Sequence, residues 1–224
     1  MEKEYSVRIG EQPIIFRTGK VAKQANGAVM ASHGETVVLT TACVTDTPRT
    51  GIDFFPLLVD FEERYYSAGK IPGGFIKREG RPSESAILSA RVADRSIRSL
   101  FDDAMRNDVH VVSTVMAMDQ VYPPNVLGIN AASAALSISG IPWGGPVGAV
   151  RIRLVGDRLV ERLSSDKYCP ILMYSSCLIV TTSSFSPDKY CPILIRCLVL
   201  QSAILFYSIL YFSPDHRESS RNRY

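Results

Sequence analysis

Side chains that can bind a phosphate backbone are concentrated between Arg64 and Arg98. This segment holds eight basic and three acidic residues, although the chain of 224 residues carries a net charge of only +3. Tyr65, Tyr66 and Phe75 are interleaved with the positive charge. Cations for phosphates, beside flat rings on which bases stack, are what a single-stranded nucleic acid requires. The alternative is a solvated basic helix face beside an ordinary loop. The basic residues are Arg64, Lys70, Lys77, Arg78, Arg81, Arg91, Arg95 and Arg98.

Other chemistry-bearing residues do not form a complete motif. Gly69-Lys70 is not a phosphate-binding loop, because Arg64 stands where an earlier glycine is required and Ile71 replaces the hydroxyl residue. We therefore predict no catalytic residues and no metal ligands in this chain.

The remaining candidates favour structural roles. Neighbouring acidic residues at a strand end are typical of a solvated sheet edge rather than of a metal site. We expect this for Asp60, Glu62 and Glu63. Histidines without a neighbouring nucleophile are expected in turns or on the surface; these are His33, His110 and His216. Cys43 lies in an apolar run and is expected to pack as a small buried hydrophobe.

The elements that must position the basic segment are predicted from periodicity and turn residues. Strands are expected over 14–18, 29–31, 36–44, 54–61, 109–118 and 147–154, with a hairpin turn at His33-Gly34. Helices are expected from the cap Ser83 to about Phe101 and over 130–139. Residues 65–82 form a long loop, of the kind that is usually functional. These elements predict an α+β fold, an α/β sandwich of one sheet with helices against it.

Composition divides the chain at Val155. Residues 1–155 hold 14 of the 15 glycines, and residues 156–224 hold four of the five cysteines. We expect an incomplete core domain over 1–155 and an unrelated tail over 156–224. The tail repeats Asp166–Leu172 as Asp188–Leu194, and its apolar stretch 193–212 is long enough to span a bilayer.

Three interpretations of the tail compete. It is a membrane anchor, a folded replacement domain, or out-of-frame or rearranged translation joined at Gly156. The third needs the fewest assumptions, because the tail has few turn and capping signals. The acidic N-terminus, which has no apolar run, favours the cytoplasm.

Several longer motifs follow one another in order along residues 3–155. They are Ala28–Val38, Asp53–Leu57, Ala68–Phe75, Arg78–Glu84, Asp94–Phe101, Asn130–Leu136 and Ser139–Gly148. Together they closely resemble the first RNase PH-like core domain of the bacterial polynucleotide phosphorylases. The resemblance implies an enzyme that degrades RNA from the 3′ end with inorganic phosphate, as a homotrimeric ring around an RNA channel.

The same resemblance implies which residues contact RNA. The expected partner of this chain is the 3′ end of single-stranded RNA, and not DNA. The residues implied to grip the RNA are Phe75, Lys77, Arg78 and Arg81. In the family pattern an aromatic residue stands at Ile76 and an arginine at Lys77, so one stacking face and one bidentate fork are missing here.

Phosphate and Mg²⁺ are held by a second core in this family, and the chain stops before that core. We therefore expect it to grip RNA, to bind neither Mg²⁺ nor phosphate, and to be inactive alone. The alternative function is a non-enzymatic RNase PH-like scaffold or a membrane-associated interaction protein; membrane association is not expected unless 193–212 is genuine.

Overall fold

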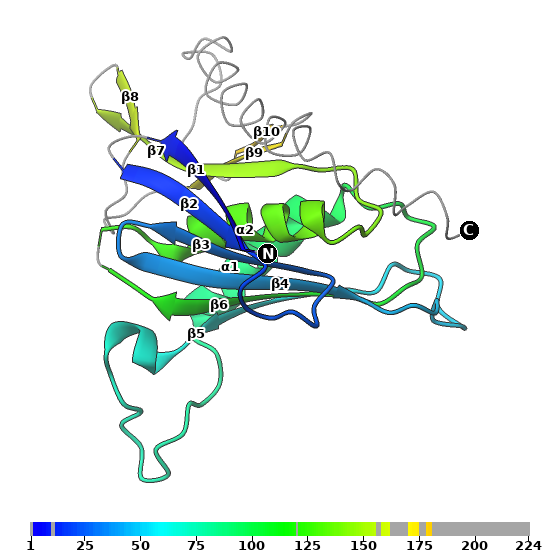
Figure 1. Cartoon of the computed structure of the whole chain (residues 1–224), viewed down its shortest axis with the longest axis horizontal. Helices are drawn as coiled ribbons and strands as arrows, with labels where there is room; N and C mark the ends of the chain where they lie inside the picture. Colours follow the sequence, from blue (N-terminus) through cyan, green and yellow to red (C-terminus); the bar gives the residue numbers. More distant parts are fainter. Residues whose placement is uncertain are drawn as a thin grey trace.

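The computed structural model describes residues 2–9, 12–119, 121–155, 158–161, 170–174 and 178–180. The apolar stretch 193–212, the second repeat copy Asp188–Leu194 and His216 lie outside these residues. The described residues form two sheets with the helix α2 (Pro124–Ile138) between them (Figure 1).

The larger sheet has six strands in the order β1-β2-β3-β4-β6-β5. Neighbouring strands are antiparallel, except that β5 runs parallel to β6. The hairpin predicted at His33-Gly34 is confirmed: His33 pairs with Thr36, and Gly34 adopts a left-handed φ of 59°. The strands are β1 (Lys3–Ile9), β2 (Gln12–Thr18), β3 (Gly27–His33), β4 (Thr36–Val44), β5 (Leu57–Glu63) and β6 (Val109–Ala117).

The smaller sheet has the strand order β10-β9-β7-β8 and is antiparallel. Its strands are β7 (Val147–Val155), β8 (Arg158–Glu161), β9 (Pro170–Tyr174) and β10 (Leu178–Val180). β9 and β10 belong to the tail, and β9 pairs with β7 along Val147–Arg151. The prediction of a single sheet was wrong. Helix α2 is apolar on both sides, so it needs a second sheet to cover it.

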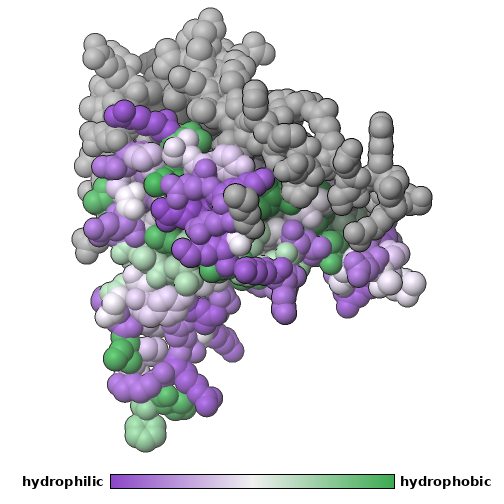
Figure 2. Space-filling model, in the orientation of Figure 1, coloured by the Kyte–Doolittle hydropathy of each residue, from purple (hydrophilic) through white to green (hydrophobic). Residues whose placement is uncertain are grey.

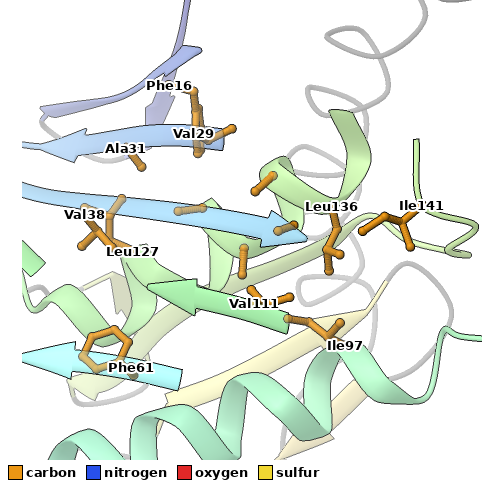
Figure 3. Packing of buried hydrophobic residues seen from close by; sticks show 14 of the residues in the cluster. Phe16, Val29, Ala31, Val38, Phe61, Ile97, Val111, Leu127, Leu136 and Ile141 are labelled. Carbon is orange, nitrogen blue, oxygen red and sulfur yellow. The ribbon is translucent and has the colours of Figure 1, made fainter. Parts of the chain in front are cut away.

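Helix α2 packs against β3, β4 and β6 on one side and against β7 on the other. It is rich in small residues, which let the backbones approach closely. A Cβ added at Gly128 would lie 2.7 Å from Cε2 of Phe61, and one added at Gly27 would overlap the Ala135 carbonyl oxygen. The main core lies at this contact, where Val38, Val111, Leu127 and Leu136 are buried (Figure 3).

Two buried polar side chains of α2 fasten β7. Asn130 donates from Nδ2 to the Ala149 carbonyl at 3.0 Å and accepts from the Ala149 amide at 2.8 Å. The hydroxyl of Ser133 accepts from the Val147 amide at 2.8 Å. These bonds satisfy backbone groups that are removed from water, so the register of helix and strand is fixed by polar contacts as well as apolar ones.

Helix α1 (Glu84–Arg98) packs against β5. As predicted, Ser83 caps it: its hydroxyl accepts from the Ala86 amide at 3.0 Å. Arg98 in its last turn pairs with Asp94 at 2.6 Å and donates to the Leu57 carbonyl at 3.0 Å. The helix is thereby fixed at its end to the first residue of β5.

The segment after β6 is held to the β3–β4 turn through Asp119. Its carboxylate accepts from the amides of Glu35, Val121 and Tyr122. Burial alone would raise the pKa of Asp119, but the hydrogen bonds outweigh it and hold that pKa below its usual range. His33 is buried, and its ring contacts the ring of Tyr122 at a tilt of 36°, with centroids 4.1 Å apart. Burial lowers the pKa of the His33 imidazole.

Several local predictions need correction. β1 was not predicted, α2 begins six residues before the expected start at Asn130, and the strand expected over 54–61 lies at Leu57–Glu63. His33 is in a turn region but is buried rather than on the surface. Cys43 is exposed, because in the β4 alternation Ala42 faces the helices and Cys43 faces away from them.

Replacing Asn130 by Ala is expected to destabilise the chain by about 2 to 4 kcal/mol, since it leaves the amide and carbonyl of Ala149 buried without a partner. Chemical denaturation of the full chain measures this change. Ser137→Ala is the control on the same helix, because the Ser137 hydroxyl donates to the Ser133 carbonyl within α2 and fastens no strand among the described residues. An equal loss in both variants would contradict the proposed fastening.

Stability is expected to fall with acidity in two stages. The folded state favours neutral His33, so this residue contributes fully to the free energy of unfolding above the unfolded pKa of about 6.5. That contribution is lost as the pH falls below 6.5, because the unfolded chain then takes up the proton more readily. Asp119 contributes above its unfolded pKa of about 3.9 and loses that contribution as the pH falls further. Melting temperatures at pH 7.5 and 5.5 test the first stage: His33→Phe should reduce the difference between them, and an undiminished difference would exclude His33 as its source.

Candidate nucleic-acid interface

The basic and aromatic segment leaves the body of the molecule where β5 ends and returns at the start of α1. It begins with a short 3-10 helix, η1 (Tyr65–Ala68), which Gly69 ends with a left-handed φ of 67°. The predicted loop over 65–82 is therefore helical in its first turn. From Gly69 to Ser83 no regular element is present, and this part projects away from the sheets at the lower left of Figure 1.

The residues predicted to contact RNA lie along this loop. Phe75 is fully exposed, and the side chains of Lys77, Arg78 and Arg81, which follow it in the chain toward α1, are exposed as well. Lys77 adopts a left-handed φ of 54° and its amide donates to the Gly74 carbonyl at 3.1 Å, which makes a tight turn around Phe75. Figure 2 shows this projection with apolar atoms at its end and hydrophilic ones around them.

The root of the loop is a compact ionic cluster. Arg64 pairs with Glu62 at 2.6 Å and with Glu79 at 3.0 Å. The second oxygen of Glu79 accepts from the Tyr65 amide at 2.8 Å. Hydrogen bonds with Glu62 and Glu79 raise the pKa of Arg64. The two ends of the loop are thus joined through one carboxylate.

Glu63 fastens the returning end of the loop to β5. Its carboxylate accepts from the hydroxyls of Ser83 at 2.7 Å and Ser85 at 3.1 Å. The 3-10 helix is held to β6 in the same region, because the Met118 amide donates to the Ser67 carbonyl at 3.0 Å. These contacts fix the root of the loop, while Phe75 at its outward turn stays exposed.

The eight basic residues between Arg64 and Arg98 do not all have the same role. Arg64 and Arg98 are bound to carboxylates and carbonyls of the fold, so both serve structure. Lys77, Arg78 and Arg81 lie on the projecting loop, where sequence spacing placed them. The sequence offered no sign that Glu79 and Glu63 fasten this loop, because their partners lie 14 to 22 residues away.

The weaker candidates do not make a second site. Asp60 pairs with His110 at 2.9 Å on the outer face of the sheet, while Glu62 contacts Arg64 and Thr114. Within the part of the chain that the structure describes, no three His, Cys, Asp or Glu side chains are placed to hold a metal ion. These residues do not fit a Mg²⁺ site.

Comparison with known proteins identifies the family of this chain. Residues 10–142 match the family described as RNase_PH, 3′ exoribonuclease family, domain 1. Polyribonucleotide nucleotidyltransferase of Moorella thermoacetica is 62% identical over 152 residues, which cover 68% of this chain and 20% of the relative. The Desulfitobacterium hafniense protein of the same name is 58% identical over 157 residues, which cover 70% of this chain and 22% of the relative. The chain therefore spans about a fifth of the length of these relatives.

Solved structures share the fold at low sequence identity. A chain of the Archaeoglobus fulgidus exosome, solved with RNA bound to the active site, aligns with a TM-score of 0.61 at 16% identity, over 93% of this chain and 87% of that chain. Rice (Oryza sativa) Rrp46 aligns with a TM-score of 0.63 at 16% identity, over 93% and 94% of the two chains. These likenesses establish the RNase PH-like α+β fold.

Among the described residues, no helix has the length and apolar character needed to cross a membrane. With the family match over 133 consecutive residues and the high identity to its curated relatives, the chain belongs to the RNase PH family of 3′ exoribonucleases, and residues 10–142 are the first domain of that family.

Proposed function

We propose that this chain is the RNA-holding first core of a polyribonucleotide nucleotidyltransferase, an enzyme that shortens RNA from its 3′ end by phosphorolysis. The observation that carries the proposal is the fully exposed ring of Phe75 on a projecting loop that is anchored at its root, with Lys77, Arg78 and Arg81 exposed along the same loop. An apolar ring in this position has no core to join, whereas a nucleic-acid base offers it a flat partner.

Each loop residue has a distinct part in the proposed grip. Phe75 stacks on a base, which is worth about 1 to 3 kcal/mol per base. Lys77 neutralises a phosphate as a point charge, and Arg78 and Arg81 can each bind phosphate oxygens with two donors. Ile76 offers apolar contact without a π face, so we expect a weaker grip than in relatives with an aromatic residue there.

The wider assignments follow from the family relationship and are part of the same proposal. Residues 1–155 are the core domain and 156–224 a tail outside the family, which agrees with matches that cover about 70% of the chain. Inorganic phosphate is the co-substrate of the complete enzyme, and Mg²⁺ supports its chemistry from residues of the second core. A cytoplasmic homotrimer is the assembly that we propose for the complete enzyme.

The grip is tested by binding of single-stranded RNA to the full chain at several salt concentrations. We expect salt-sensitive binding, because phosphate contacts release counterions. Replacing Phe75, Lys77, Arg78 and Arg81 together by alanine should raise the dissociation constant by at least about 30-fold, since a stacked base and up to three phosphate contacts are lost.

A matched control removes the same residue classes elsewhere. Phe54 is an exposed aromatic residue, and Arg8, Lys20 and Lys23 are exposed bases outside the loop. Alanine at these four positions should change binding by less than about threefold, as expected for long-range charge alone. If the two quadruple variants bind alike, the loop is not the RNA site, and the scaffold function is favoured.

The chain alone is expected to lack phosphorolytic activity, because the family places the phosphate and metal ligands in the second core. Purified chain, poly(A), Mg²⁺ and inorganic phosphate should release no ADP above a reaction without phosphate. The reaction without phosphate also reports any contaminating hydrolytic nuclease. Phosphate-dependent release of ADP would show that the first core carries catalytic groups of its own.

A further inference from the structure

Glu79 occupies a special place in the loop. It lies next to Arg78 in the sequence and is the one acidic residue between Tyr65 and Pro82. Its two oxygens hold two different groups at the opposite end of the loop, the Tyr65 amide at 2.8 Å and the Arg64 guanidinium at 3.0 Å. Its side chain is only 24% exposed, so these bonds are partly shielded from water.

Arg64 links this contact to the sheet. Its other terminal nitrogen donates to Glu62 at 2.6 Å, and Glu62 lies in β5 and accepts from the Thr114 hydroxyl of β6 at 3.2 Å. The returning end of the loop is therefore connected through Glu79, Arg64 and Glu62 to two strands. Between Gly74 and Lys77 the loop makes its own turn. The position of that turn depends on where its ends are held.

We propose that Glu79 is a positioning residue for RNA binding: it fixes the root of the loop so that Phe75, Lys77 and Arg78 face the RNA together. This inference rests on the proposed function of the loop. Without Glu79 the loop samples more conformations, and binding must order it again, which lowers affinity without removing any contact of the bound state.

Charge and loop positioning change RNA affinity in opposite directions when Glu79 is neutralised. Removing an acidic residue beside Arg78 makes the loop more positive, so electrostatics alone would tighten binding to a polyanion. Loss of positioning acts in the opposite direction. A weaker complex after neutralisation of Glu79 is therefore not explained by charge.

The experiment uses the full chain with Glu79→Ala and Glu79→Gln, and single-stranded RNA at several salt concentrations. Glu79→Ala should raise the dissociation constant roughly three- to tenfold, with the slope against log salt unchanged, because every phosphate contact is kept. Glu79→Gln keeps an oxygen for the Tyr65 amide but loses the ion pair, so its effect should lie between wild type and alanine.

Glu84→Gln is the control for charge. Glu84 is an exposed acid in the first turn of α1, close in sequence to the loop but with no part in the root cluster. It should leave binding unchanged or slightly tighter. Binding by Glu79→Ala that equals or exceeds that of wild type would overturn the inference.

A second measurement does not depend on RNA. Trypsin should cut after the exposed Lys70 several-fold faster in Glu79→Ala than in wild type, with the melting temperature of the fold unchanged; this bond lies away from position 79, so the substitution does not alter its own sequence context. If wild type fails to bind RNA while cleavage accelerates as expected, the proposed function is wrong but Glu79 still orders the loop. If wild type binds RNA and neither affinity nor cleavage responds to Glu79→Ala, the positioning inference is wrong and the proposed function stands.

Discussion

The close contact between α2 and the two sheets is the constraint on which the rest of the structure depends. Gly27 and Gly128 leave no room for a Cβ, so the helix lies directly against β3 and beside Phe61 of β5. Asn130 and Ser133 fasten the opposite side of the same helix to β7. Because β5 and β6 share this core, the strand from which the loop over residues 65–82 departs is held at a defined position.

The loop divides its charged residues between two tasks. At the root, carboxylates and Arg64 are paired with one another and with backbone groups, so their charge is used inside the protein. At the tip, Phe75 and its basic neighbours are exposed. A fixed root and an open tip are what a grip needs if it is to hold a flexible strand without a large ordering cost.

Local patterns in the sequence were sufficient for much of this structure. Ser83 followed by Glu84 marked the start of α1, and the β-branched run at Thr36–Val44 marked β4 with both of its ends. Long-range contacts were not accessible to the same reasoning. The exposure of Cys43 depends on which face of β4 meets α2, and the pairing of Glu79 with Tyr65 depends on a loop that folds back on itself. The second sheet was missed because it covers α2, whose apolar residues lie on all sides of the helix and so do not reveal how many sheets pack against it.

The central claim is that the tip of the loop is the surface that meets RNA. Photochemical crosslinking of the full chain to single-stranded RNA, followed by mass spectrometry of the linked peptides, tests it most directly because it locates the contact without altering the protein. We predict crosslinks to residues between Phe75 and Arg81. Crosslinks confined to the outer face of the six-stranded sheet, with none in the loop, would contradict the account.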